Sequence, residues 1–88
     1  MQKRNFTIVN RLGLHARAAA LLVKTASRFS SEITIKKEDM EVNGKSIMGI
    51  LLLAAPKGSD ILLMIDGSDE ELAMQQLAEL IEDGFGEE

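Results

Sequence analysis

Residues 60–65 most constrain what this chain can fold into. They read Asp-Ile-Leu-Leu-Met-Ile, a nearly continuous apolar run of strand length. A strand that is apolar on both of its faces is typical of the centre of a sheet. The remaining sequence is therefore expected to supply the strands that flank this one.

Three other segments show the alternation of apolar and polar residues that predicts half-buried strands. Residues 4–10 place Phe6 and Ile8 on one face, and residues 32–37 place two isoleucines on one face. Residues 40–42 return after a short polar turn, so this pair predicts a hairpin.

Two helices are expected between these strands. The first extends from Ala16 to about Ser27, with apolar residues at the spacing of a helix that lies on a sheet. These residues are Ala19, Leu22, Val23, Ala26 and Phe29. The second helix extends from Ile47 to Ala54, with Ser46 as its N-cap.

A third helix is expected near the C-terminus. Ser68 and Glu71 have the Ser-x-x-Glu spacing of a capping box, and Gly84 supplies a stop signal. An apolar stripe between them consists of Met74, Leu77, Ala78 and Ile81. The element order β-α-β-β-α-β-α predicts a single α+β domain over residues 1–88. We expect an open-faced sandwich, in which three helices cover one face of a four-stranded, mainly antiparallel sheet.

The composition narrows the functional class. The chain contains no cysteine, which fits a reducing compartment, and its N-terminus carries no apolar segment of the signal-peptide type. We therefore expect a cytoplasmic monomer that inserts in no membrane. The formal net charge is −4 and both tyrosine and tryptophan are absent, which argues against nucleic acid as a partner.

Charge is divided unevenly along the chain. All ten lysines and arginines lie in residues 1–57 against four acidic residues, whereas residues 58–88 contain ten acidic residues and no basic one. Two interpretations stay open: the acidic residues cover a solvated C-terminal helix, or the folded molecule has a positive face around His15.

Most enzyme classes lack their required residues in this chain. It has one histidine and no cysteine, no Gly-x-Ser-x-Gly elbow, and no complete phosphate-binding loop. A zinc site would need acidic ligands close to His15, but the acidic residues lie far along the chain. No metal and no cofactor are therefore expected.

The setting of His15 suits one kind of chemistry. The residue follows a turn in which Gly13 can adopt a positive φ, and it directly precedes the helix expected from Ala16. The free amides and dipole of a helix N-terminus stabilise an anion, and Arg17 adds a positive charge with several donors. Because a neutral imidazole is a nucleophile, His15 could carry a phosphoryl group in this environment. A solvated histidine without a chemical role stays the alternative.

Two motifs carry a resemblance to a known family. They are GLHARAA (residues 13–19) and NGKSIMGILLLAAPKGS (residues 43–59). The first resembles the active-site motif of the HPr family, the histidine-containing phosphocarriers of the bacterial phosphoenolpyruvate:sugar phosphotransferase system. The second is similar to the family's regulatory-serine region. The separation of the motifs, the chain length and the element order also match, so the resemblance covers the whole chain.

The resemblance implies a role for three residues. His15 would accept a phosphoryl group on Nδ1 from phospho-enzyme I and pass it to the A-type domains of enzyme II. Arg17 would neutralise and orient the phosphate, and Ser46 would be the site modified by HPr kinase/phosphorylase. From the residues alone, Ser46 stays open to interpretation as a plain helix N-cap.

The resemblance also implies a docking surface for enzyme I, enzyme II and transcriptional regulators. An apolar patch with a basic rim would form it, from Ile47, Met48, Leu51, Lys24, Arg28 and Lys45. By spacing alone, the apolar members of this set could instead be core residues.

The sequence departs from the family pattern at three positions. Ala18 stands where the family usually has proline, Ala20 lacks a common hydroxyl, and Leu52 is more apolar than is usual. Features of the sugar branch and of the nitrogen-regulatory branch are mixed. Two non-enzymatic functions therefore stay open: a phosphocarrier that acts through His15, or a regulatory binding module controlled at Ser46.

Overall fold

Strand β4 (Asp60–Asp66) lies between two other strands, as its apolar sequence predicted. The structure is a computed structural model that describes residues 1–87. Its sheet has four strands in the order β1-β4-β2-β3, and every neighbouring pair is antiparallel. The other strands are β1 (Gln2–Thr7), β2 (Glu32–Lys37) and β3 (Met40–Asn43). The expected element order and open sheet are confirmed.

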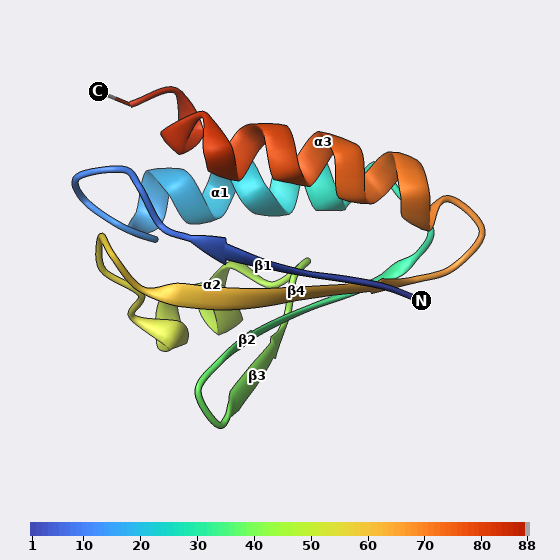
Figure 1. Ribbon diagram of the computed structural model, residues 1–88, viewed down its shortest axis with the longest axis horizontal. Helices are drawn as coiled ribbons and strands as arrows, with labels where there is room; N and C mark the ends of the chain where they lie inside the picture. The colour runs from blue at the N-terminus through green and yellow to red at the C-terminus, as the bar shows by residue number, and fades with distance from the viewer. Residues whose placement is uncertain (88) are drawn as a thin grey trace.

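Three α-helices pack on this sheet: α1 (Ala16–Ala26), α2 (Ile47–Leu53) and α3 (Glu70–Glu82). Helices α1 and α3 lie side by side over the strands (Figure 1), and α2 packs beside α1 and against β2 and β3. A short 3₁₀ turn, η1 (Gly84–Gly86), follows α3. The end of the described chain thereby lies at the same end of the molecule as the β1–α1 loop (Figure 1).

The core lies between the helices and one face of the sheet. In β4, Ile61, Leu63 and Ile65 point into this core and are fully buried. Leu62 and Met64 lie on the opposite face, where they are half-buried and pair across the sheet with polar residues of β1 and β2. The apolar run of β4 is therefore covered by helices on one side only, and the other face of the sheet is solvated, as expected.

The helices bury the apolar stripes that their spacing predicted. The stripe residues of α1 and α3 are buried, apart from Val23, which is half-buried. The short helix α2 is different, because it buries only Ile50 and Leu53. Its remaining apolar side chains face outwards.

The prediction for the first strand was wrong at both ends. Strand β1 begins two residues earlier, because its first residues continue the pairing with β4, and it stops at Thr7 instead of residue 10. Ile8 leaves the regular ladder: its amide donates to the carbonyl of Ser59 and its carbonyl accepts from the amide of Gly58, each at 2.8 Å. The side chain of Ile8 stays buried, so the alternation of apolar and polar residues continues past the end of the strand.

The predicted capping box at the start of α3 was also wrong. The N-cap position belongs to Asp69, and its carboxylate makes no hydrogen bond within its own helix. Instead it accepts from the amides of Ser30 and Ser31, at 2.9 and 3.0 Å, and from the hydroxyl of Ser31. These bonds, the hydroxyl bond above all, lower the pKa of Asp69 to about 2. The start of α3 is therefore tied to the α1–β2 connection and not to its own first turn.

Candidate functional site

His15 occupies the N-cap of α1, which begins at Ala16 as predicted. Its backbone is extended, with φ −78° and ψ −179°, and its carbonyl accepts from the amide of Ala19 at 2.8 Å. The imidazole makes no capping hydrogen bond to the helix amides, and 26% of the side chain is exposed. The ring therefore stands at the positive end of the helix dipole, beside amides that have no partner within the helix.

A close backbone contact fixes the loop that leads into His15. Gly13 has φ +67°, as its place in the turn predicted, and an added Cβ would lie 2.4 Å from the carbonyl oxygen of Ala55. The next residue, Leu14, is buried and its amide donates to the same carbonyl at 2.9 Å. The backbone before His15 is thus held against the α2–β4 connection.

The end of the described chain returns to His15. Gly84, with φ +64°, ends α3 as predicted, and the buried side chain of Phe85 anchors the turn that follows. Glu87 then lies beside the histidine: one carboxylate oxygen accepts from Asn10 Nδ2 at 2.8 Å, and the other contacts His15 Nε2. The hydrogen bond from Asn10 and the neighbouring His15 lower the pKa of the Glu87 carboxyl.

Sequence reasoning missed both Asn10 and Glu87. Asn10 is 2% exposed, and its Nδ2 also donates to the carbonyl of Gly13 at 2.7 Å. Its only signal in the sequence was its place in a turn. Nothing in the sequence marked Glu87, since 72 positions separate it from His15.

Arg17 lies in the first turn of α1 and is exposed. It forms no ion pair with any of residues 1–87. It is nevertheless close enough to Glu87 for its charge to contribute to the lowered pKa of that carboxyl. The guanidinium therefore stands at the His15 end of the helix with its donors available to an anion.

Apolar side chains surround an open hollow of about 200 Å³ beside His15. Its lining consists of Leu12, Leu14, His15, Ala54, Ala55 and Pro56. Helix α2, whose C-cap Ala54 lines this hollow, exposes Ile47, Met48 and Leu51 by 42%, 70% and 36% of their surface. These three residues are thus not core residues. With Leu12 and Leu52, which are 59% and 66% exposed, they form what we call the α2 patch.

Ser46 is the N-cap of α2, and its hydroxyl accepts from the amide of Gly49 at 3.1 Å. The predicted N-cap is therefore confirmed. The neighbouring Lys45 donates from Nζ to the carbonyl of Phe29, just beyond the C-terminus of α1, at 2.7 Å. The start of α2 thus lies on the side of α1 away from His15, whereas the connection after α2 contacts the loop before His15.

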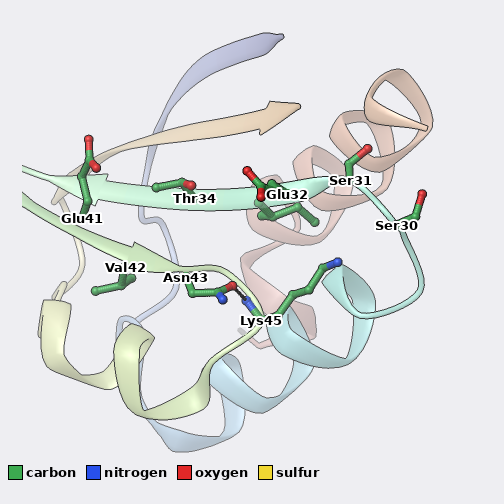
Figure 2. Close-up of a pocket in the computed structure, with 9 residues that line it drawn as sticks. Ser30, Ser31, Glu32, Thr34, Glu41, Val42, Asn43 and Lys45 are labelled. Atoms are coloured by element: carbon green, nitrogen blue, oxygen red, sulfur yellow. Dashed lines mark hydrogen bonds between the residues drawn. The ribbon is translucent and has the colours of Figure 1, made fainter. Parts of the chain in front are cut away.

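The residues of the predicted basic rim lie around the C-terminal end of α1, but they line different grooves. Lys24 is exposed in the last turn of α1, whereas Arg28 lines a groove between α1 and the acidic face of α3. Lys45 lines a second groove of about 450 Å³ between the α1–β2 connection and strands β2 and β3. Figure 2 shows its ammonium group reaching towards the end of α1, while Glu32 and Glu41 stand along the strands.

Two further observations bear on function. Within residues 1–87, no cluster of three or more histidine, aspartate or glutamate side chains is arranged to hold a metal ion. In the same part of the chain, no helix is both long and apolar enough to cross a membrane.

Comparison with known proteins identifies the family. The family sequence model described as the PTS HPr component phosphorylation site matches residues 2–83. The chain belongs to the HPr family of phosphocarrier proteins of the phosphotransferase system. A phosphocarrier protein HPr from Xylella fastidiosa is 52% identical over 88 residues, which are 100% of this chain and 99% of that protein.

Solved HPr structures share the fold. The crystal structure of HPr-C-His from Thermoanaerobacter tengcongensis matches with a TM-score of 0.97 at 50% identity, covering 100% of this chain and 99% of that one. An HPr dimer from the same organism matches with a TM-score of 0.80 at 49% identity, covering 99% of this chain and 100% of that one. The open-faced sandwich predicted from the sequence is thus the HPr fold.

Proposed function

We propose that this HPr-family protein relays phosphoryl groups on Nδ1 of His15, from phospho-enzyme I to the A-type domains of enzyme II. The observation that supports this most is the partly exposed imidazole at the N-terminus of α1. Its Nε2 contacts Glu87, while its Nδ1 has no hydrogen bond with residues 1–87. The step needs no metal ion and no cofactor.

In the transfer, the Nδ1 lone pair forms a bond to phosphorus. The bond between phosphorus and the donor atom of phospho-enzyme I breaks, and its electron pair returns to that atom. Because the transferred group carries negative charge on its oxygens, catalysis depends on donors positioned around it. The free amides of α1 and the exposed Arg17 supply such donors at this end of the helix. Release to the next acceptor follows the same path in reverse.

We propose that partner proteins dock on the α2 patch, with Ile47, Met48 and Leu51 as the apolar contacts. The support is their exposure on α2, the helix whose C-cap, Ala54, lines the hollow that contains His15. Lys24, Arg28 and Lys45 would form the basic rim of this surface for acidic partners. We expect Arg28 to contribute least to the attraction of acidic partners, because it lines the same groove as the carboxylates of α3.

Ser46 is proposed as a regulatory phosphorylation site for HPr kinase/phosphorylase. Phosphorylation adds a charge of about −1.5 to −2, and here it would do so at the edge of the α2 patch. Acidic partners would then bind less tightly. The same position supports the second candidate function, a regulatory module of the nitrogen branch in which Ser46 controls protein contacts, including those with transcriptional regulators, and His15 has no chemical role.

Intact mass spectrometry after incubation with phosphoenolpyruvate and enzyme I tests the relay. The wild type is expected to gain one acid-labile phosphoryl group, which His15→Ala lacks and Ser46→Ala keeps. A wild type that stays unmodified, while the same enzyme I phosphorylates another HPr, would contradict the relay. A parallel incubation with ATP and HPr kinase/phosphorylase tests Ser46, and the expected acid-stable phosphate should be absent from Ser46→Ala.

We also propose that the carrier acts as a monomer in the cytoplasm. The HPr dimer among the similar structures makes the oligomeric state worth measuring. Light scattering is expected to give a molar mass near the 9.6 kDa of one chain. A mass of twice that value across the concentration range would contradict the monomer.

A further inference from the structure

Glu87 makes a contact that the phosphocarrier role does not by itself explain. It lies four residues beyond the end of the matched family region at residue 83, yet its carboxylate contacts the imidazole of His15. We propose that Glu87 is a positioning residue for His15, holding the Nε2 proton so that the Nδ1 lone pair faces the incoming phosphoryl group. The proposal rests on the proposed relay and deepens it.

The identity of the donor in this contact follows from the carboxylate. The lowered pKa of Glu87 keeps the group ionised near neutral pH. An ionised carboxylate can only accept hydrogen bonds. Nε2 must therefore carry the proton that the two groups share, and in the neutral ring this leaves Nδ1 unprotonated.

Asn10 fixes the carboxylate in turn. Its Nδ2 donates both to Glu87 and to the carbonyl of Gly13, so both contacts of this nitrogen are with acceptors and the orientation of the amide is determined. Gly13 itself packs against Ala55. The ring of His15 is thus connected, through Glu87 and Asn10, to the part of the loop that packs against Ala55.

The contact also suits the charge balance of the transfer. When Nδ1 gains the phosphoryl group and Nε2 keeps its proton, the ring acquires a positive charge. Glu87 stands against Nε2, where it stabilises that charge, and Arg17 is a further charged group at this end of α1. The carboxylate acts through the ring and touches no reacting atom.

Two substitutions at Glu87 distinguish its effect on the position of the imidazole proton from the effect of losing its charge. Glu87→Ala removes the acceptor. In Glu87→Gln, the oxygen of the new side-chain amide would accept from Asn10 Nδ2, so the nitrogen of that amide would face His15 Nε2 and donate to it. An Nε2 that accepts a hydrogen bond places the ring proton on Nδ1, and Nδ1 then has no lone pair for attack on phosphorus. Glu87→Gln should therefore be the slower of the two. Asp83→Asn is the matched control, because it makes the same charge change on an exposed side chain that has no hydrogen bond or ion pair with His15.

The first measurement is the ¹⁵N chemical shifts of the two ring nitrogens, followed well above the ordinary titration range of histidine. The wild type and Asp83→Asn are expected to show the proton on Nε2, Glu87→Ala a shift towards the average of the two tautomers, and Glu87→Gln a shift towards the proton on Nδ1. Identical ring shifts in all four proteins would overturn the proposal.

The second measurement is the rate of phosphorylation by phospho-enzyme I. Loss of a carboxylate that orients a metal-ligating histidine through its second ring nitrogen typically costs about 10- to 100-fold in affinity or activity. By analogy we expect a fall of about tenfold in kcat for Glu87→Ala and a larger one for Glu87→Gln. KM should not change, since the α2 patch is untouched. Unchanged or faster rates in both variants would overturn the proposal. If the wild type takes up no phosphoryl group while its ring shifts still respond to Glu87→Ala, the relay is what fails and the hold on the ring stands.

Discussion

At the scale of single residues, the site depends on a few positions that tolerate no other side chain or conformation. Gly13 combines both restrictions, because it has a positive φ and faces the backbone of Ala55 and Pro56 at 2.4 and 2.8 Å from an added Cβ. A backbone neighbour cannot rotate away as a side chain can. The conformation of the loop before His15 therefore requires a glycine at position 13.

Gly13→Ala is expected to lower the free energy of unfolding by more than the strain of a positive φ alone, which costs about 1–2 kcal/mol. Gly58→Ala is the matched control, because Gly58 has φ +91° and no atom within 4 Å of its added Cβ. Denaturant unfolding of both variants gives the comparison. Equal losses of stability would show that the contact with Ala55 carries no energy.

Ser46→Ala removes the acceptor for the amide of Gly49. Loss of an N-cap of this kind typically costs about 1 kcal/mol, and we expect that loss in urea unfolding. Ser27→Ala, at an exposed serine at the end of α1, should change the stability by less than about 0.5 kcal/mol. Equal effects would show that the hydroxyl of Ser46 does not cap α2. Because Ser46→Ala is expected to be less stable than the wild type even without phosphorylation, assays of this variant must also show that it is folded.

At the scale of elements, the sequence was most informative where local pattern decides the structure. The alternating strands, the stripes of α1 and α3, and the central place of β4 were all predicted correctly. The end of β1 was not, because the loop at Gly58 and Ser59 takes over the pairing of Ile8. The start of α3 was not, because Asp69 bonds to a segment some 38 positions away.

The same distinction applies to the site. His15, Arg17 and Ser46 could be proposed from the sequence because they lie in local motifs or at helix starts. Asn10 and Glu87 were not, because their contact joins positions 77 apart, and no local spacing encodes it. The exposure of Ile47, Met48 and Leu51 was anticipated through the resemblance, and its physical reason is that the seven-residue helix α2 buries only Ile50 and Leu53.

Helix α2 supplies the prediction on docking. Met48 is 70% exposed on α2, and Leu72 is 51% exposed on α3. If partners dock on the α2 patch, Met48→Asp should lower kcat/KM for phosphorylation by about tenfold, while Leu72→Asp should leave it unchanged. Both variants should unfold like the wild type, since neither side chain is part of the core. A larger loss for Leu72→Asp would place the docking surface on α3.

At the scale of the whole molecule, Asp69 links resistance to acid with the packing of α3. Its pKa is lowered from 3.8 to about 2 by the hydroxyl of Ser31 and the amides of Ser30 and Ser31. A carboxyl whose pKa is lower in the folded protein stabilises the fold above its unfolded value and loses that contribution as the pH falls towards the folded value. The stabilisation by Asp69 should therefore be complete above pH 3.8 and disappear as the pH approaches about 2.

Asp69→Asn is expected to flatten the pH dependence of the unfolding free energy in this window and to lower stability at neutral pH. Unfolding by urea at a series of pH values measures both. Asp39→Asn, at an exposed position in the β2–β3 turn, is the control and should keep the wild-type slope. A wild-type slope in Asp69→Asn would show that the bonds to Ser30 and Ser31 do not persist in solution.

The direction of α2 has a consequence for how signals are combined. Its start lies by the end of α1, through Lys45 and Phe29, and its end lies by the start of α1, through Ala55 and Leu14. With a rise of about 1.5 Å per residue, the helix separates Ser46 from the His15 end by its whole length. A phosphate on Ser46 would then not need to change the conformation around the imidazole of His15. If both residues are phosphorylated as proposed, a partner whose binding surface spans α2 would contact both ends of the helix, so the two modifications would be combined at the partner without a change in the carrier's fold.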